Sequence, residues 1–197
     1  MSETTIQKNQ LTLEEFKKSV ITDYKLVCES RETSLIGRRE VLSGKGSFGI
    51  FGDGKELAQI AMARCFKKGD FRSGYYRDQT FMMAVKEMNV KQFFAALYGH
   101  ADLNFEPQSG GRQMVAHFST SSLNEDGSWK NLSQQYNSAS DISCTAGQMP
   151  RLVGLAQASK YYRESKLSKE WNKFSEKGNE IAWGTIGNAS TSEGHFF

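Results

Sequence analysis

The feature that most constrains the fold is the stretch from Ile181 to Gly194, an apolar run that ends in a turn of small residues. The run is too short for a helix and predicts a strand, and Thr191 or Ser192 can cap a helix that begins after the turn. In an open α/β sheet, such a junction lies at the carboxyl end of a strand, where ligands bind. The stretch therefore favours an α/β fold with a ligand site at this turn.

The turn itself, Gly187-Asn188-Ala189, has the chemistry of an anion and metal site. Free backbone N–H groups at such a junction suit an anion such as a diphosphate. Asn188 lies at the tip and offers a side-chain oxygen, the kind of ligand that magnesium combines with substrate phosphates. Turns of glycine and serine before helices are also common where nothing binds, so an ordinary turn between strand and helix is the alternative.

Composition is that of an ordinary soluble globular chain, and 197 residues predict one domain with an arm. No apolar run approaches the roughly 18 residues of a membrane span. The net charge of +3 is small, and basic residues are scattered among carboxylates, which argues against a nucleic-acid surface. The three cysteines lack zinc or disulfide spacing, which favours a reducing cytoplasm.

The amino-terminal region predicts a frayed tail followed by helices. Met1 to Gln10 is polar, and a capping box from Thr12 to Glu15 then opens a helix that can continue to Leu42. A second helix is predicted from Asp53, as its cap, to Phe66, and its apolar and small residues predict that it is buried. The apolar residues of the first helix share one face: Leu13, Phe16, Val20, Tyr24 and Val27.

A glycine motif between these helices, Gly44 to Gly49, matches G-x-G-x-x-G, and Ala84-Val85-Lys86 imitates the lysine element of a protein kinase. A predicted helix separates the two, and no His-Arg-Asp or Asp-Phe-Gly element occurs. The residues before the glycines also make a poor strand for a dinucleotide fold. The motif is therefore interpreted as a loop.

The segment from Asp70 to Gln79 predicts a loop that is dense in hydrogen-bond donors. The planar guanidinium of Arg77 fits phosphate oxygens in a bidentate manner, and Tyr76 adds a hydroxyl, so the two side chains together suit a diphosphate. The alternative is a solvated Arg77 that forms an ion pair with Asp78.

A glycine turn further along leads to His117, the histidine best placed for chemistry. An imidazole beside an anionic substrate can donate a hydrogen bond or transfer a proton near neutral pH, although a lone histidine is more often structural. Residues 119–140 are rich in Ser, Asn and Gly and predict a surface excursion. Asp141 returns the chain to the core, and a helix is predicted from Gln148 to Tyr162.

Four segments, in this order, resemble the alpha part of thiamine-diphosphate-dependent 2-oxo acid dehydrogenases. The Gly-Arg-Gln-Met element is more similar to the branched-chain enzyme than to the pyruvate enzyme. The resemblance begins near Lys25, and residues 119–140 and 163–178 resemble insertions. The four segments are Gly74 to Gln79, Gly110 to Met114 with His117, Ile142 to Pro150, and Gly187 to Gly194.

The resemblance assigns roles residue by residue. Tyr76 and Arg77 match residues that hold the diphosphate, and Ser143 and Thr145 match residues that line the cofactor cleft. His117 matches a histidine near the reacting carbon of the cofactor. The turn of Gly187, Asn188 and Ala189 matches a Gly-Asp-Gly turn that binds magnesium and diphosphate, with Asn188 as the metal ligand. Asn188 replaces an aspartate, so the resemblance implies weaker metal binding.

The resemblance implies oxidative decarboxylation of a branched-chain 2-oxo acid with thiamine diphosphate and Mg²⁺, followed by acyl transfer to a lipoyl group on a partner acyltransferase. The glutamate that activates the cofactor is expected from a beta part, as a separate chain or fused, within an oligomer. A second metal ligand is expected some thirty residues after the turn, beyond Phe197. We therefore expect an amino-terminal piece of a longer polypeptide that is inactive by itself.

The expected architecture is an α/β thiamine-diphosphate-binding fold with a parallel sheet, incomplete at its carboxyl end. A tail and helix over residues 1–24 are expected to precede the amino-terminal portion of the dehydrogenase domain over 25–197. Two alternatives remain open. The chain could belong to a pyruvate dehydrogenase or another thiamine enzyme, or it could be a module that binds the cofactor or assists assembly without catalysis.

Overall fold

The structure, a computed structural model, describes residues 11–165 and 169–197, so the expected tail at 1–10 lies outside the described residues. Helices and strands alternate along the second half of the chain. The elements are α1 (Leu13–Leu42), α2 (Glu56–Cys65), β1 (Phe71–Ser73), α3 (Gln79–Ala84), α4 (Val90–Leu97), η1 (Leu132–Gln134), β2 (Asn137–Ala139), α5 (Gln148–Glu164), η2 (Lys169–Lys173), β3 (Ala182–Gly184) and η3 (Asn188–Ser192).

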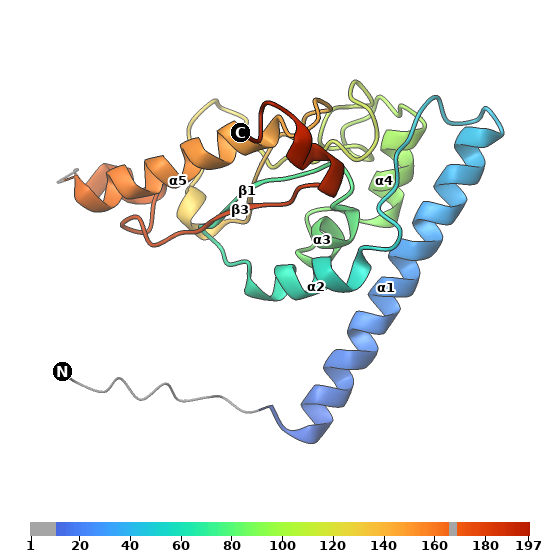
Figure 1. The fold of residues 1–197 in the computed structure, drawn as a ribbon, viewed down its shortest axis with the longest axis horizontal. Helices are drawn as coiled ribbons and strands as arrows, with labels where there is room; N and C mark the ends of the chain where they lie inside the picture. Colours follow the sequence, from blue (N-terminus) through green and yellow to red (C-terminus); the bar gives the residue numbers. More distant parts are fainter. Residues whose placement is uncertain (1–10, 166–168) are drawn as a thin grey trace.

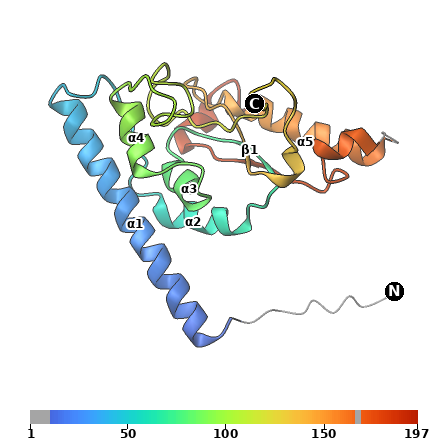
Figure 2. The same ribbon diagram turned by 180° about the vertical axis from the view of Figure 1, so that it is seen from behind.

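The sheet has three parallel strands in the order β2-β1-β3. Phe71 at the start of β1 pairs with Asn137 of β2 and with Ala182 of β3, so the three strands end level with one another. Helix α5 lies along one side of the sheet and α2 and α3 lie on the other (Figures 1 and 2). This arrangement confirms the predicted α/β fold with a parallel sheet.

An aromatic and methionine-rich core fills the space between the sheet and α1 to α4. Phe66 stands at its centre, where it contacts Phe81 edge to face at 5.1 Å and stacks on Tyr136 at 5.6 Å between ring centroids. Trp183 of β3 reaches the same ring. These contacts join α2, α3, β2 and β3 in one apolar cluster.

The predicted capping box of α1 is confirmed, since Thr12 and Glu15 bond reciprocally and the helix continues to Leu42. Its first half projects away from the rest of the molecule (Figure 1), and the apolar face that the sequence shows there is exposed. The buried residues of α1 lie in its second half and are small: Ser30, Thr33, Ser34 and Gly37. Close packing against α3 favours such small side chains.

The prediction for α2 is only partly correct. The helix begins at Glu56 without a side-chain cap, and Asp53 instead forms an ion pair with Arg38. Leu57 is exposed, while Glu56, Gln59 and Ile60 are buried. Polar side chains are buried here because they bond across to neighbouring segments, as Gln59 does to the Arg77 carbonyl at 2.8 Å.

Two strands were not expected from the sequence. The predicted loop at 70–79 contains β1, and the predicted excursion at 119–140 contains β2. The end of the chain also differs, because η3 begins directly after Gly187 and has no side-chain cap. Thr191 lies inside η3 and donates to the Asn188 carbonyl at 2.6 Å, so it does not cap a later helix.

Candidate functional site

The carboxyl ends of the three strands bring the candidate residues to one edge of the sheet. β1 leads into Tyr75, Tyr76 and Arg77, β2 leads into Asp141 and Ser143, and β3 leads into the turn at Gly187. Parallel strands that end level place the loops that follow them side by side. The strand ends therefore form a single candidate site.

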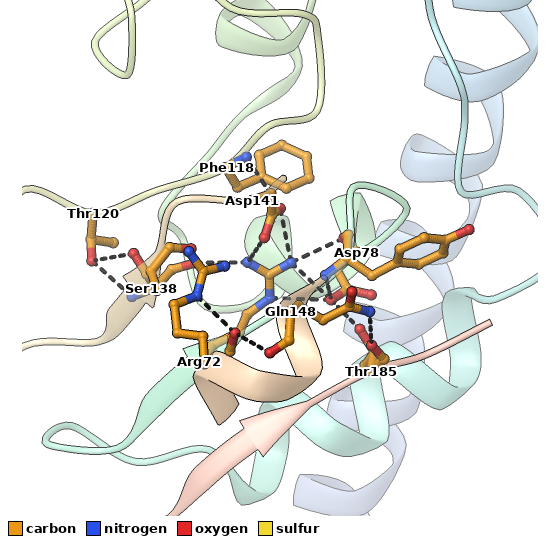
Figure 3. Close-up of polar contacts among 12 residues, drawn as sticks. Arg72, Asp78, Phe118, Thr120, Ser138, Asp141, Gln148 and Thr185 are labelled. Carbon is orange, nitrogen blue, oxygen red and sulfur yellow. Dashed lines mark hydrogen bonds and ion pairs between the residues drawn. The ribbon is translucent and has the colours of Figure 1, made fainter. Parts of the chain in front are cut away.

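A buried ionic network lies beneath this edge (Figure 3). Arg72 of β1 is 1% exposed, and its guanidinium bonds to Asp78 at 2.8 Å and to Asp141 at 3.0 Å. Ser138 of β2 accepts a further bond at 2.7 Å, and Asp141 accepts from the Phe118 backbone N–H at 3.2 Å. One arginine thus joins the ends of β1 and β2 to the segment that carries His117.

The charged side chains of this network, Arg72, Asp78 and Asp141, are buried. Burial alone lowers the pKa of the Arg72 guanidinium, but Asp141 and Asp78 together raise it above its usual value. Burial raises the pKa of Asp141, and the positive charge of Arg72 opposes that rise. Removing one partner of such a buried pair costs about 3–5 kcal/mol, because the other charge is left uncompensated.

Gly74 makes room for the network. A Cβ at this position would collide with the guanidinium of Arg72, which occupies that space. The Arg72 side chain can therefore lie beneath the loop that follows β1 only because Gly74, two residues later, has no side chain.

Tyr75, Tyr76 and Arg77 form a compact group above the network. The two tyrosine rings lie 4.3 Å apart and their hydroxyls 3.3 Å apart, while the Arg77 guanidinium lies 5.8 and 5.9 Å from the two rings. Burial and the bond to Tyr76 raise the pKa of Tyr75 to about 12. The Tyr75 hydroxyl therefore stays neutral and able to donate at physiological pH.

The alternative interpretation of Arg77, an ion pair with Asp78, does not hold. Asp78 is 2% exposed and bonds to Arg72, and among residues 11–165 and 169–197 no carboxylate forms an ion pair with Arg77. The Nε atom of Arg77 is buried and has no hydrogen-bond partner among the described residues. The Arg77 guanidinium thus has a buried N–H donor that no described residue engages.

His117 lies beside this group. Its ring stacks on Tyr76 with 6.0 Å between centroids, and its Nε2 lies 2.7 Å from the Ser143 hydroxyl. Its Nδ1 lies 3.3 Å from the Val115 carbonyl. A carbonyl only accepts, so Nδ1 carries the proton, and in the neutral ring Nε2 accepts from Ser143.

The turn at Gly187 completes the edge from the β3 side. A Cβ on Gly187 would lie 3.6 Å from the Tyr75 hydroxyl, which places the turn next to the tyrosine pair. Thr185, two residues earlier, donates to Asp78 at 2.6 Å and so attaches the end of β3 to the ionic network.

The structure therefore brings together five of the eight predicted site residues: Tyr76, Arg77, His117, Ser143 and Gly187. Asn188 and Ala189 are exposed at the start of η3, and Thr145 is exposed on the segment between β2 and α5. Among residues 11–165 and 169–197, no group of three or more His, Cys, Asp or Glu side chains is arranged to hold a metal ion.

Sequence reasoning missed the residues beneath the site, chiefly Arg72, Tyr75, Asp141 and Thr185. Arg72 lies within the segment that was predicted as a loop, and the alternative interpretation paired Asp78 with Arg77 instead of Arg72. The available signal was the glycine at 74, since a glycine two residues after an arginine leaves space for that side chain.

Within the described ranges, no helix is both long enough and apolar enough to cross a membrane.

A family model described as the dehydrogenase E1 component matches residues 25–197, which include every predicted site residue. A search of curated proteins found no match. The match covers most of the chain, so the chain belongs to the dehydrogenase E1 component family, the thiamine-diphosphate-dependent component of 2-oxo acid dehydrogenases.

Proposed function

We propose that this chain is the alpha part of a branched-chain 2-oxo acid dehydrogenase, in which it holds thiamine diphosphate and carries His117 into the catalytic site. The observation that carries the proposal is the convergence of Tyr76, Arg77, His117 and Ser143, from three separate segments, at the carboxyl edge of the sheet. When bound, the cofactor supplies the electron sink for decarboxylation.

Two features of the structure fit a diphosphate. The buried Nε of Arg77 lacks a partner, and phosphate oxygens are suitable acceptors for it. Gly187 has φ −74°, and an added Cβ would make only ordinary contacts at 3.5 Å or more, so neither its backbone nor its packing requires a glycine. A ligand that approaches the backbone closely would explain both features.

The metal is proposed to be Mg²⁺, with Asn188 as a ligand through its side-chain oxygen. Asn188 is exposed at the start of η3, next to Gly187. A neutral amide contributes one oxygen without charge, so the diphosphate itself must neutralise most of the metal's charge. Ala189, Thr145 and Ser143 would line the same cleft.

His117 is proposed to donate to, or accept a proton from, the reacting substrate. The Tyr76 ring holds one face of the imidazole, and the Val115 carbonyl defines which nitrogen carries the proton. When no substrate is bound, the Ser143 hydroxyl can donate a hydrogen bond to Nε2 of His117. These contacts orient the imidazole before the substrate arrives.

The preference for a branched substrate rests on the surroundings of His117. A small pocket with His117 in its lining is bordered by six apolar and six polar residues, and its apolar side would suit an aliphatic side chain better than the methyl group of pyruvate. The apolar members of the wall are Met88, Phe93, Ala96, Met114, Ala116 and Phe118.

The remaining partners are proposed from the family. A beta part would supply the glutamate that activates the cofactor, and a lipoyl-bearing acyltransferase would accept the acyl group, within an oligomer. We place the enzyme in the cytoplasm, because Cys28, Cys65 and Cys144 are free and exposed, which suits a reducing compartment.

The test is a substrate profile of the complete enzyme, assembled with its beta part. Decarboxylation of 3-methyl-2-oxobutanoate should exceed that of pyruvate by at least about tenfold in kcat/KM, a difference of ~1.4 kcal/mol that one or two buried methyl groups can supply. A preference for pyruvate would assign the alternative member of the family, and absence of decarboxylation would favour a module without catalysis.

An Arg77→Ala variant of the same enzyme separates cofactor binding from folding. Loss of the guanidinium should weaken thiamine diphosphate binding by about 10–100-fold, in line with the ~1.5–3 kcal/mol of a charged hydrogen bond, and leave the melting temperature nearly unchanged. Unchanged cofactor affinity would refute the assignment of Arg77 to the diphosphate.

A further inference from the structure

One carboxylate oxygen beneath the site accepts hydrogen bonds from four donors. Asp78 Oδ2 lies 2.8 Å from Arg72 Nη2, 3.2 Å from Arg72 Nε, 3.1 Å from the Tyr75 backbone N–H and 2.6 Å from the Thr185 hydroxyl. Asp78 itself follows directly after Arg77. Figure 3 shows this carboxylate between the Arg72 guanidinium and Thr185.

These four bonds join the two segments proposed to hold the diphosphate and the metal. The Tyr75 bond closes the loop that carries Tyr76 and Arg77, because both of its ends meet at Asp78. The Thr185 bond attaches the end of β3, two residues before Gly187. Beyond the pairing of β1 with β3, which ends at Ser73 and Gly184, this short side-chain contact therefore links the Arg77 loop to the segment that leads into the Gly187 turn.

The backbone of Thr185 is held from the opposite side. Its carbonyl accepts from Gln148 Nε2 at 2.8 Å, and Gln148 is the first residue of α5 and is 2% exposed. Thr185 thus lies between α5 and Asp78 with both its carbonyl and its hydroxyl engaged. A residue held at two points has little freedom to shift, and the turn that follows it shares that restriction.

The Thr185 hydroxyl is not needed to neutralise Asp78. Arg72 already supplies a buried positive charge to that carboxylate, and the Tyr75 N–H supplies a further donor. Loss of the hydroxyl would therefore leave no unpaired buried charge, and the network would persist without it. The consequence should appear in the position of the turn rather than in folding.

We propose that Thr185 is a positioning residue whose hydroxyl, through Asp78, sets the Gly187-Asn188 turn at the spacing from Arg77 that the metal and diphosphate of the cofactor require. The inference rests on the proposed function, since it assigns Thr185 a role toward the same cofactor. It goes further in naming a residue that touches neither cofactor nor substrate.

The experiment uses the complete enzyme and titrates thiamine diphosphate by quenching of intrinsic fluorescence, at several Mg²⁺ concentrations. Thr185→Val replaces the hydroxyl by a methyl group and so keeps the shape of the side chain. Thr185→Ala removes the hydroxyl and the γ-methyl group together. Both should raise the Kd for the cofactor by about tenfold and raise the Mg²⁺ concentration at half-saturation. Thr185→Ser retains the hydroxyl and should bind within about twofold of the wild type.

Thr33→Val is the matched control. Thr33 is 2% exposed, and its hydroxyl donates to the Glu29 carbonyl at 2.7 Å within α1, so the same atoms are lost from a buried bond at a distant place. Its melting temperature should fall at least as far as that of Thr185→Val, with cofactor affinity unchanged. A purely structural role for Thr185 predicts the same behaviour in both variants.

The outcomes are distinguishable. If the wild-type enzyme does not bind thiamine diphosphate, the proposed function fails and the role of Thr185 fails with it. If the wild type binds but both hydroxyl-free variants bind equally well at every Mg²⁺ concentration, the positioning role alone is refuted. If Thr185→Ser behaves like Thr185→Ala, the hydroxyl is not the acting group, and the proposal is again refuted.

Discussion

At the scale of one residue, Gly187 is a position where neither the backbone conformation nor the packing requires a glycine. Its φ of −74° is accessible to any residue, and an added Cβ would meet only Ser190 Oγ at 3.5 Å and the Tyr75 hydroxyl at 3.6 Å, which are ordinary contacts. By contrast, the glycine at 74 is required by the Arg72 side chain. Packing therefore explains the glycine at 74, whereas the glycine at 187 has no packing reason and is assigned to the proposed diphosphate site.

Gly187→Ala is expected to leave folding intact and to weaken binding of the cofactor. The unfolding free energy should change by less than ~1 kcal/mol, since the backbone conformation suits alanine. The Kd for thiamine diphosphate should rise by about tenfold or more, because the methyl group points toward the Tyr75 hydroxyl. Calorimetry and cofactor titration measure the two quantities.

Gly154→Ala serves as the control for that experiment. Gly154 lies within α5, and a Cβ there would meet nothing within 4 Å. The change should stabilise the helix by about 0.5–1 kcal/mol without altering cofactor affinity. Equal affinity of Gly187→Ala and Gly154→Ala would show that no ligand approaches the turn at Gly187.

At the scale of elements, α1 is attached to the rest of the molecule mainly through its second half. Gln79 of α3 bonds to Ser30 and Ser34, and Arg31 forms a bidentate pair with Glu56 at 2.6 and 2.8 Å. Glu56 also accepts from the Gly54 N–H before α2. The pair therefore ties α1 to the start of α2.

This ion pair makes a prediction about pH. The hydrogen bond from Arg31 lowers the pKa of Glu56 below its ordinary value of 4.5, despite the opposing effect of burial. A carboxyl group whose folded pKa is depressed adds stability above its unfolded pKa and loses it as the pH falls through the folded pKa. The wild type should therefore lose stability below about pH 4.5 more steeply than Glu56→Gln.

Urea unfolding between pH 7 and pH 3 measures this difference. Glu14→Gln is the control, since the Lys17–Glu14 pair lies on the same helix but is exposed, and exposed pairs contribute little. Its pH dependence should match that of the wild type. If the curves for Glu56→Gln and the wild type run parallel over this range, the pair does not couple α1 to α2 energetically.

At the scale of the whole molecule, one apolar core supports the sheet from the side of α1 to α4, and the ionic network lies at its border. Phe81 is 1% exposed and contacts both parts, with its ring 5.1 Å from that of Phe66 and 5.8 Å from the Arg72 guanidinium. The core and the site are therefore adjacent layers of one structure.

Phe81→Ala should destabilise the fold by about 3–5 kcal/mol, since it removes buried contacts and leaves a cavity beside the network. Phe16→Ala, at an exposed position of α1, should cost less than ~1 kcal/mol. Denaturant unfolding of both variants provides the comparison. An equal cost for the two would mean that the projecting half of α1 is covered in solution.

Local signals in the sequence determined several elements of this protein correctly. The capping box at Thr12 defines the start of α1, the pattern after Gln148 defines α5, and the apolar run that begins at Ile181 contains β3. Each of these signals acts within a few residues along the chain, so it is visible without tertiary contacts. The motifs that carry Tyr76, Arg77, His117 and Gly187 were visible for the same reason.

Only the tertiary structure decided β1, β2 and the network beneath the site. Strands of three residues show no periodicity, and Phe71 finds its partners Asn137 and Ala182 far along the chain. Adjacency in sequence offered Asp78 as the alternative partner of Arg77, whereas the fold turns Asp78 inward to Arg72 and Thr185. A buried polar group must form hydrogen bonds with the groups that the fold places beside it. Those groups belong to other segments of the chain, so the local sequence does not reveal them.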